Sequence, residues 1–153
     1  MAKFQGFTSA HPINRDFGLL IIRLGVGFSM MLFHGYDKIS GGPELWRGLG
    51  AATQNLGFDF APVFWGFMAA FAEFVCSILV VLGVVFRPAA ALLAINMLVA
   101  VLFHLNMPAG ADNAGWSGAS HALELLAVYV GFLLIGPGRY AFSLMTRREG
   151  PRA

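Results

Sequence analysis

Three histidines and a glutamate lie in or beside apolar segments, where ionisable side chains are rare. His34 and His104 each come near the end of such a segment, and His121 precedes Glu124 by three residues near the start of another. Imidazole titrates near neutral pH, and histidine is the commonest metal ligand. Within a membrane, ionisable side chains usually face a cavity or a partner rather than lipid. These four residues are our candidates for proton exchange or ligand binding.

Their depths favour a shared site. Measured from the middle of its own segment, each histidine lies about 10–11 Å towards the same side, and Glu124 about 5 Å, at a rise of 1.5 Å per residue. His34 follows Arg23 by eleven residues, and eleven steps of about 100° return to nearly the same face of a helix. Lys38 continues this stripe. We therefore expect His34, His104, His121 and Glu124 to line one mouth of a helix bundle, beside Lys38.

A second polar set consists of Arg23, Glu73 and Asn96. Glu73 and Asn96 lie about 1–2 Å from the middle of their segments, and Arg23 about 5 Å from the middle of its own. At so small an offset Arg23 and Glu73 can pair, and pairing offsets much of the cost of burying each charge. We expect a structural polar layer that locks the bundle. There are two alternatives. The set could form a working proton or ligand site, or Arg23 could snorkel beside a protonated Glu73.

Several chemistries fit the mouth. Our main hypothesis is proton exchange with a quinol head group, with His34, His104 and Glu124 catalytic and Lys38 and His121 binding the ligand. A metal fits less well, because di-iron bundles use two Glu-x-x-His pairs and two further glutamates, whereas this chain has one pair in reversed order. Two histidines could also ligate haem, or the histidines could be hydrogen-bonded for packing alone. We assign no metal site, and the cofactor stays open.

The composition indicates a membrane protein. The chain has 153 residues, of which 58% are hydrophobic and 12% charged, against about 25% charged in soluble domains. So small a chain has too little interior to hide this apolar surface from water. Four segments approach the roughly 20 apolar residues that a spanning helix needs: residues 17–36, 62–86, 88–105 and 119–136. We predict an all-α integral membrane protein, an antiparallel four-helix bundle.

Local signals set the expected helix ends. Asn14 or Asp16 can cap the first helix, and proline costs least at a helix start, as at Pro62 and Pro88. Arg87 and Pro88 alone would separate the second and third spans. Gly136-Pro137-Gly138 ends the fourth span.

The basic residues outside the spans predict the orientation. Seven lie in the tails and the second connection, against two, Lys38 and Arg47, in the first and third connections. An excess of positive charge marks the cytoplasmic side. We expect a cytoplasmic tail over 1–16, a membrane domain over 17–144 and a basic cytoplasmic tail over 145–153. The first connection is expected to form a short interfacial helix anchored by Trp46. A net charge of +2 gives no reason to expect nucleic acid as a partner.

With these residues in place, the chain resembles the DoxX family of small four-helix bacterial membrane proteins over residues 17 to about 144. The resemblance rests on the order of short motifs. These are R-x-G and H-G-x-x-K in the first span, E with L-G-x-x-x-R in the second, a histidine that closes the third, and E with G-P-G-R at the end. By this resemblance, the positions that match the family motifs are Arg23, His34, Lys38, Glu73, His104 and Glu124. His121 is added to the candidate site from its spacing alone.

The family includes subunits of quinol-oxidising and thiosulfate:quinone systems. The resemblance therefore implies a multi-pass component of a quinone-linked oxidoreductase in the bacterial cytoplasmic (inner) membrane. Its expected partners are the lipid bilayer, a quinone and other redox subunits. The alternative is a non-catalytic scaffold that recruits redox or stress enzymes. A permease is disfavoured, because one four-helix bundle offers little room for alternating access.

Overall fold

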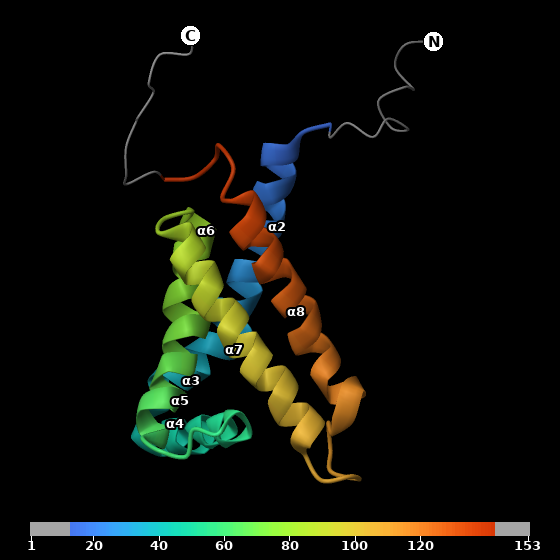
Figure 1. The fold of residues 1–153 in the computed structure, drawn as a ribbon. Coiled ribbons are helices and arrows are strands. Elements are labelled where there is room, and N and C mark those ends of the chain that lie inside the picture. The colour runs from blue at the N-terminus through green and yellow to red at the C-terminus, as the bar shows by residue number, and fades with distance from the viewer. Residues whose placement is uncertain (1–12, 143–153) are drawn as a thin grey trace.

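The computed structural model describes residues 13–142, and within them every regular element is a helix. The predicted tail over 145–153 and most of the tail over 1–16 lie outside the described residues. The elements, in chain order, are α2 (Arg15–Met30), the π-helix η1 (Met31–Gly35), α3 (Tyr36–Ser40), α4 (Gly42–Gly50), the 3-10 helix η2 (Ala51–Leu56), α5 (Pro62–Phe71), the π-helix η3 (Ala72–Cys76), α6 (Ser77–Leu82), α7 (Phe86–Asn106) and α8 (Gly115–Ile135) (Figure 1).

Four helical stretches are long and apolar enough to cross a membrane, which confirms the predicted number of spans. They are Arg15–Ser40, Pro62–Leu82, Phe86–Asn106 and Gly115–Ile135. The first is longer than the predicted segment 17–36, because α2, η1 and α3 follow one another without a break. Lys38, which the sequence placed in a connection, therefore lies within the first helical stretch.

The turn between the second and third spans differs from the prediction. Gly83 and Val85 take left-handed backbone angles (φ 74° and 45°), and α7 then starts at Phe86. A glycine in this conformation commonly ends a helix. Arg87 and Pro88 belong instead to the first turn of α7, where the missing N–H of proline has no helical partner to lose.

The predicted helix signals at Asn14, Pro62 and Gly136 are confirmed, whereas α8 starts at Gly115, before the predicted residue 119. Asn14, one of the two candidate caps, accepts a hydrogen bond from the Phe17 N–H at 3.0 Å. Pro62 begins α5, and α8 ends at Ile135 before Gly136. The start of α2 and the end of α8 lie together, because the Arg15 guanidinium donates to the Ile135 carbonyl at 3.1 Å (Figure 1).

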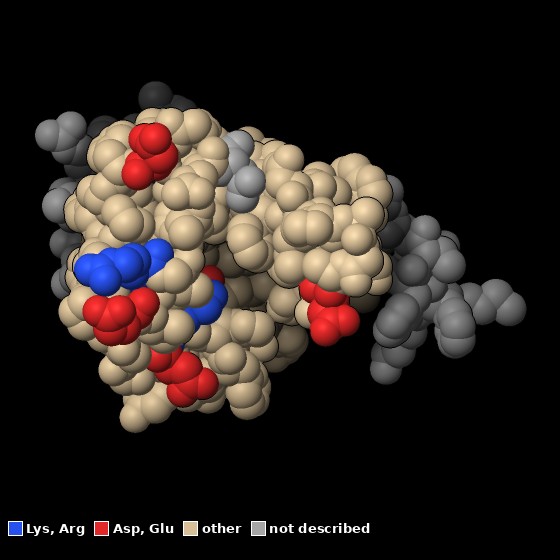
Figure 2. Space-filling model, turned by 90° about the horizontal axis from the view of Figure 1, so that it is seen from below, with Lys and Arg blue, Asp and Glu red and all other residues tan. Residues whose placement is uncertain are grey.

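The core lies where α7 packs between α8 and the second span. Its buried side chains include Leu93 and Met97 from α7, Tyr129 and Phe132 from α8, and the lone cysteine, Cys76. Many large apolar side chains remain exposed on the outer faces of the spans, as expected for helices that face lipid. At the end where α4 lies, acidic and basic side chains are scattered over a mostly uncharged surface, which is hollowed (Figure 2).

The expected short helix in the first connection is present as α4. Its Trp46, however, is attached to the protein: the indole Nε1 donates to the Lys38 carbonyl at 2.7 Å, and the ring packs edge-on against Phe67. Any side chain at Gly50 or Gly66 would collide with backbone across the α4–α5 contact. The two glycines thus let α4 lie directly against α5, where it can wall a cavity.

Candidate functional site

Two π-helices, η1 and η3, contact each other in the middle of the first two spans. His34 lies in η1 and Glu73 in η3. A Cβ added at Gly35 would lie 2.7 Å from the carbonyl carbon and oxygen of Glu73, so the two backbones touch at this level. Single π-helical turns within α-helices are frequent at functional sites, because the extra residue re-aims the side chains around it.

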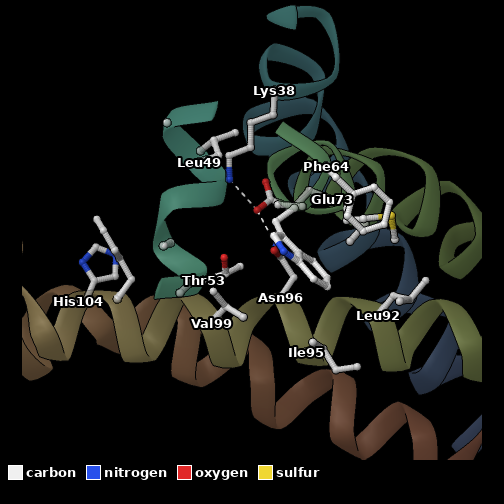
Figure 3. Close-up of a pocket in the computed structure, with 18 residues that line it drawn as sticks. Lys38, Leu49, Thr53, Phe64, Glu73, Leu92, Ile95, Asn96, Val99 and His104 are labelled. Atoms are coloured by element: carbon white, nitrogen blue, oxygen red, sulfur yellow. Dashed lines mark hydrogen bonds and ion pairs between the residues drawn. The ribbon is translucent and has the colours of Figure 1, made fainter. Parts of the chain in front are cut away.

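Glu73 is the centre of the polar layer. Its side chain is buried, and Oε1 accepts hydrogen bonds from the Lys38 Nζ at 2.6 Å and the Asn96 Nδ2 at 2.8 Å (Figure 3). The other carboxylate oxygen, Oε2, is buried without a hydrogen-bond partner. The structure thus brings Glu73 and Asn96 together as expected, but their basic neighbour is Lys38.

The expected pair of Arg23 with Glu73 is wrong. Arg23 is 1% exposed, and its guanidinium donates to the main-chain carbonyls of Val81, Pro137 and Tyr140 at 3.0, 2.6 and 2.8 Å. The midpoints of the first and second spans are not level with each other, because the contact of Gly35 with Glu73 sets how far one helix is displaced along the other. Residues of η1 and α3, rather than the middle of α2, are level with Glu73.

A cavity with a volume of about 590 Å³, the larger cavity below, lies beside this carboxylate. Residues of α4, η2, α5, η3 and α7 wall it, and most of them are apolar, such as Leu92 and Val99. Glu73, Asn96 and Lys38 lie together on its wall, and His104 lies apart from them (Figure 3). The Trp65 indole also lines it, and its Nε1 is buried without a partner. Two residues of the cavity wall, Glu73 and Trp65, thus each carry a buried polar atom without a hydrogen-bond partner.

The smaller cavity, of about 200 Å³, brings the three histidines together. The rings of His34 and His121 pack with centroids 5.5 Å apart. The His104 Nδ1 lies 2.8 Å from the Asn113 carbonyl oxygen, within hydrogen-bond distance. Lys38, Glu73 and His104 line both cavities. An ion pair and a histidine thus form the partition between the two.

Glu124 does not join this site, contrary to the expectation. It is exposed and lines neither cavity, and within residues 13–142 its carboxylate forms no hydrogen bond or ion pair. Helix neighbours three residues apart differ by about 60° in direction. His121 can therefore lie against His34 while Glu124 lies on the outward face of α8.

Two features of the site were missed. Nothing in the apolar stretch PVFWGF distinguishes Trp65 as a cavity-lining residue whose indole N–H has no partner. The π-helices also leave no mark in residue type, although Gly35 beside His34 is consistent with a close backbone contact. Within the described part of the chain, no group of three or more His, Cys, Asp or Glu side chains is arranged to hold a metal ion.

Comparison with known proteins agrees with the motifs. A protein-family model described as DoxX matches residues 18–106. The match runs from α2 to the end of α7, so it includes Lys38, Glu73 and Asn96, and it stops before α8. No curated protein and no solved structure matches the chain. Because the family model covers more than half of the sequence, this membrane protein belongs to the DoxX family.

Proposed function

We propose that this protein binds a quinone-type, lipid-soluble ligand in the larger cavity, as a component of a quinone-linked oxidoreductase. One observation carries the proposal: the buried, unpartnered Oε2 of Glu73 at the polar end of an otherwise apolar cavity. A buried polar atom without a hydrogen bond costs about 1–3 kcal/mol. A ligand hydroxyl that donates to Oε2 would remove this cost.

The dimensions and polarity of the cavity suit such a ligand. A volume of about 590 Å³ is within the range of about 300–1,000 Å³ for small-molecule pockets, which are mostly apolar with few polar groups. A quinol has hydroxyl donors, and a quinone has carbonyl acceptors. Glu73 Oε2 would accept from the first, and Trp65 Nε1 would donate to the second. Lys38 balances the charge of the Glu73 carboxylate in either case.

The smaller cavity supplies a route for protons in this proposal. Glu73 would take the two protons of a bound quinol one after the other and pass each to His104, which lines both cavities, and then to His34 and His121. The catalytic roles of His34 and His104 and the ligand-binding role of Lys38 belong to this proposal. The two electrons of quinol oxidation need an acceptor, which we propose to be another redox subunit.

Our proposal places the protein in the bacterial cytoplasmic membrane as an antiparallel bundle with both termini in the cytoplasm. The end with α4 and the connection between α7 and α8 would then face outward. Support comes from the basic residues, which are concentrated in the tails and at Arg87.

Binding of a short-chain quinone analogue to the protein in lipid nanodiscs, measured for its quinol form and for its quinone form, tests the ligand proposal. Glu73→Gln replaces the carboxylate acceptor with an amide, and Trp65→Phe removes the donor. Glu73→Gln is expected to weaken binding of the quinol, and Trp65→Phe binding of the quinone, each by about tenfold, the equivalent of one hydrogen bond. The matched control is Glu44→Gln, because Glu44 is an exposed carboxylate on α4. Its binding should equal that of the wild type.

Circular dichroism must show that each variant keeps its helical content. The proposal fails if the wild-type protein binds no analogue, or if all variants bind equally well. The scaffold alternative would then be favoured, with its expectation of a stable soluble enzyme partner.

A further inference from the structure

One wall of the larger cavity is also part of the outer surface of the protein. Phe64 of α5 and Ile95 and Phe103 of α7 line the cavity, and they are 53%, 59% and 40% exposed. The polar end of the cavity differs, because the side chain of Glu73 is only 5% exposed. Lining residues with so much exposed surface mark the edge of an opening. The cavity is therefore open between α5 and α7 and closed at Glu73.

The courses of the helices account for this opening. Beside the turn at Gly83, α6 packs on α7, and η3 packs on α7 as well. Towards the α4 end, α5 and α7 diverge and no longer pack closely on each other (Figure 1). There η2 packs against both α5 and α7 and spans the gap at its end. The opening is thus bounded by α5, α7 and η2, on the side of the bundle.

The depth of the opening decides what lies outside it. Ile95 is one residue from the middle of α7 (Phe86–Asn106), which is one of the stretches long and apolar enough to cross a membrane. At a rise of 1.5 Å per residue, Ile95 then lies about 2 Å from the middle of a hydrocarbon core about 30 Å thick. An exposed side chain at this depth faces lipid tails. The opening therefore leads into the interior of the bilayer rather than into water.

We propose that this lateral opening admits a prenylated quinol from the bilayer and holds the first part of its isoprenoid tail while the head group lies at Glu73. The inference rests on the proposed function. Exposing a hydrocarbon tail to water is unfavourable, and a ligand that entered from the end of the bundle would have to do so. Through the lateral opening the tail stays in apolar surroundings, because Phe64, Leu92 and Ile95 line that side of the cavity (Figure 3). The ligand class is thus a polar head group with a hydrocarbon tail, and not a head group alone.

Binding of a quinol with a farnesyl chain, compared in lipid nanodiscs with binding of the short-chain quinol, tests the inference. Ile95→Trp places a larger side chain in the opening. It should weaken binding of the farnesyl quinol by about tenfold, because overfilling an occupied space is unfavourable, and change binding of the short-chain quinol little. Leu98→Trp is the matched control, because Leu98 is also exposed on α7 but lines neither the larger nor the smaller cavity. It should leave binding of both quinols unchanged, and circular dichroism should show that both variants keep their helical content.

If the short-chain quinol does not bind the wild type, the proposed function fails and this inference with it. If the short-chain quinol binds, but Ile95→Trp leaves binding of the farnesyl quinol unchanged or Leu98→Trp weakens it equally, only this inference is overturned.

Photo-labelling of the wild type gives a second measurement that needs no substitution. A farnesyl quinol with a diazirine on its first isoprene unit should label Phe64 or Ile95, and excess unlabelled farnesyl quinol should remove this label. Label on Leu98 should not respond to the excess. Label that is confined to α2 or α8 overturns the inference. So does label at the opening that persists in the excess, since a phospholipid chain would then occupy the opening.

Discussion

At the scale of single residues, the polar layer depends on one acidic residue with two neighbours. Oε1 of Glu73 receives both the Lys38 ammonium and the Asn96 amide, while the carboxylate is deeply buried. Lys38 keeps more of its side chain accessible, 28% against 5% for Glu73. Removing one member of a buried ion pair leaves an uncompensated charge, which is usually worse than removing both.

We therefore expect Lys38→Met and Glu73→Gln each to lower the free energy of unfolding by about 3 kcal/mol, and the double variant to recover part of that loss. Loss of helical signal during titration of micelles with sodium dodecyl sulfate measures this. The exposed pair Glu44–Arg47 is the control, because exposed pairs couple by at most about 1 kcal/mol. Purely additive losses at Lys38 and Glu73 would contradict the pairing.

At the scale of elements, Arg23 attaches the chain after α8 to the first two spans. Its guanidinium reaches carbonyls of α6 and of the segment that follows Gly136. Phe142, in this same segment, makes a further contact with the second span: its N–H donates to the Leu82 carbonyl at 2.9 Å. A planar guanidinium can reach several acceptors at once, whereas the lysine ammonium is a compact point charge on a flexible stem.

Arg23→Lys should therefore destabilise the protein by about 2 kcal/mol, since at least one buried carbonyl loses its donor. The unfolding titration described above measures the loss, and Arg47→Lys on exposed α4 is expected to change nothing. Equal stability of Arg23→Lys and the wild type would show that the three carbonyl contacts add little to the fold.

At the scale of the whole molecule, the ends of the spans divide into two groups. The start of α2 and the chain after α8 lie together, as the Asp16 carboxylate accepts from the Arg139 N–H at 3.2 Å. The opposite end holds α3, α4 and the connection between α7 and α8 (Figure 1). We propose that the group with the termini faces the cytoplasm, because the basic residues are concentrated there.

Reporter fusions check this orientation. Insertions at Gly41 and Asp112 should be active with an external reporter, and a fusion after Ala153 with a cytoplasmic one. A control set with the two reporters exchanged should be inactive at each position. An external C-terminal end would contradict the orientation and place both cavities on the cytoplasmic side.

The spans themselves could be predicted from the sequence because they are local properties. A run of about 20 apolar residues is sufficient to indicate a membrane helix, and Asn14, Pro62 and Gly136 bound helices through the conformations and hydrogen bonds of their own residues. The family motifs likewise pointed to Glu73 and His34. These features need no knowledge of how one helix lies against another.

The partners of those residues were decided by tertiary structure. Depth along a straight helix suggested Arg23 for Glu73, but the backbone contact at Gly35 shifts the two spans and makes Lys38 the neighbour. Spacing in the chain grouped Glu124 with His121, but packing of α8 divides them between an exposed face and a cavity. The offset and rotation of one helix against another depend on packing across the whole bundle, which the pattern of any single segment does not contain.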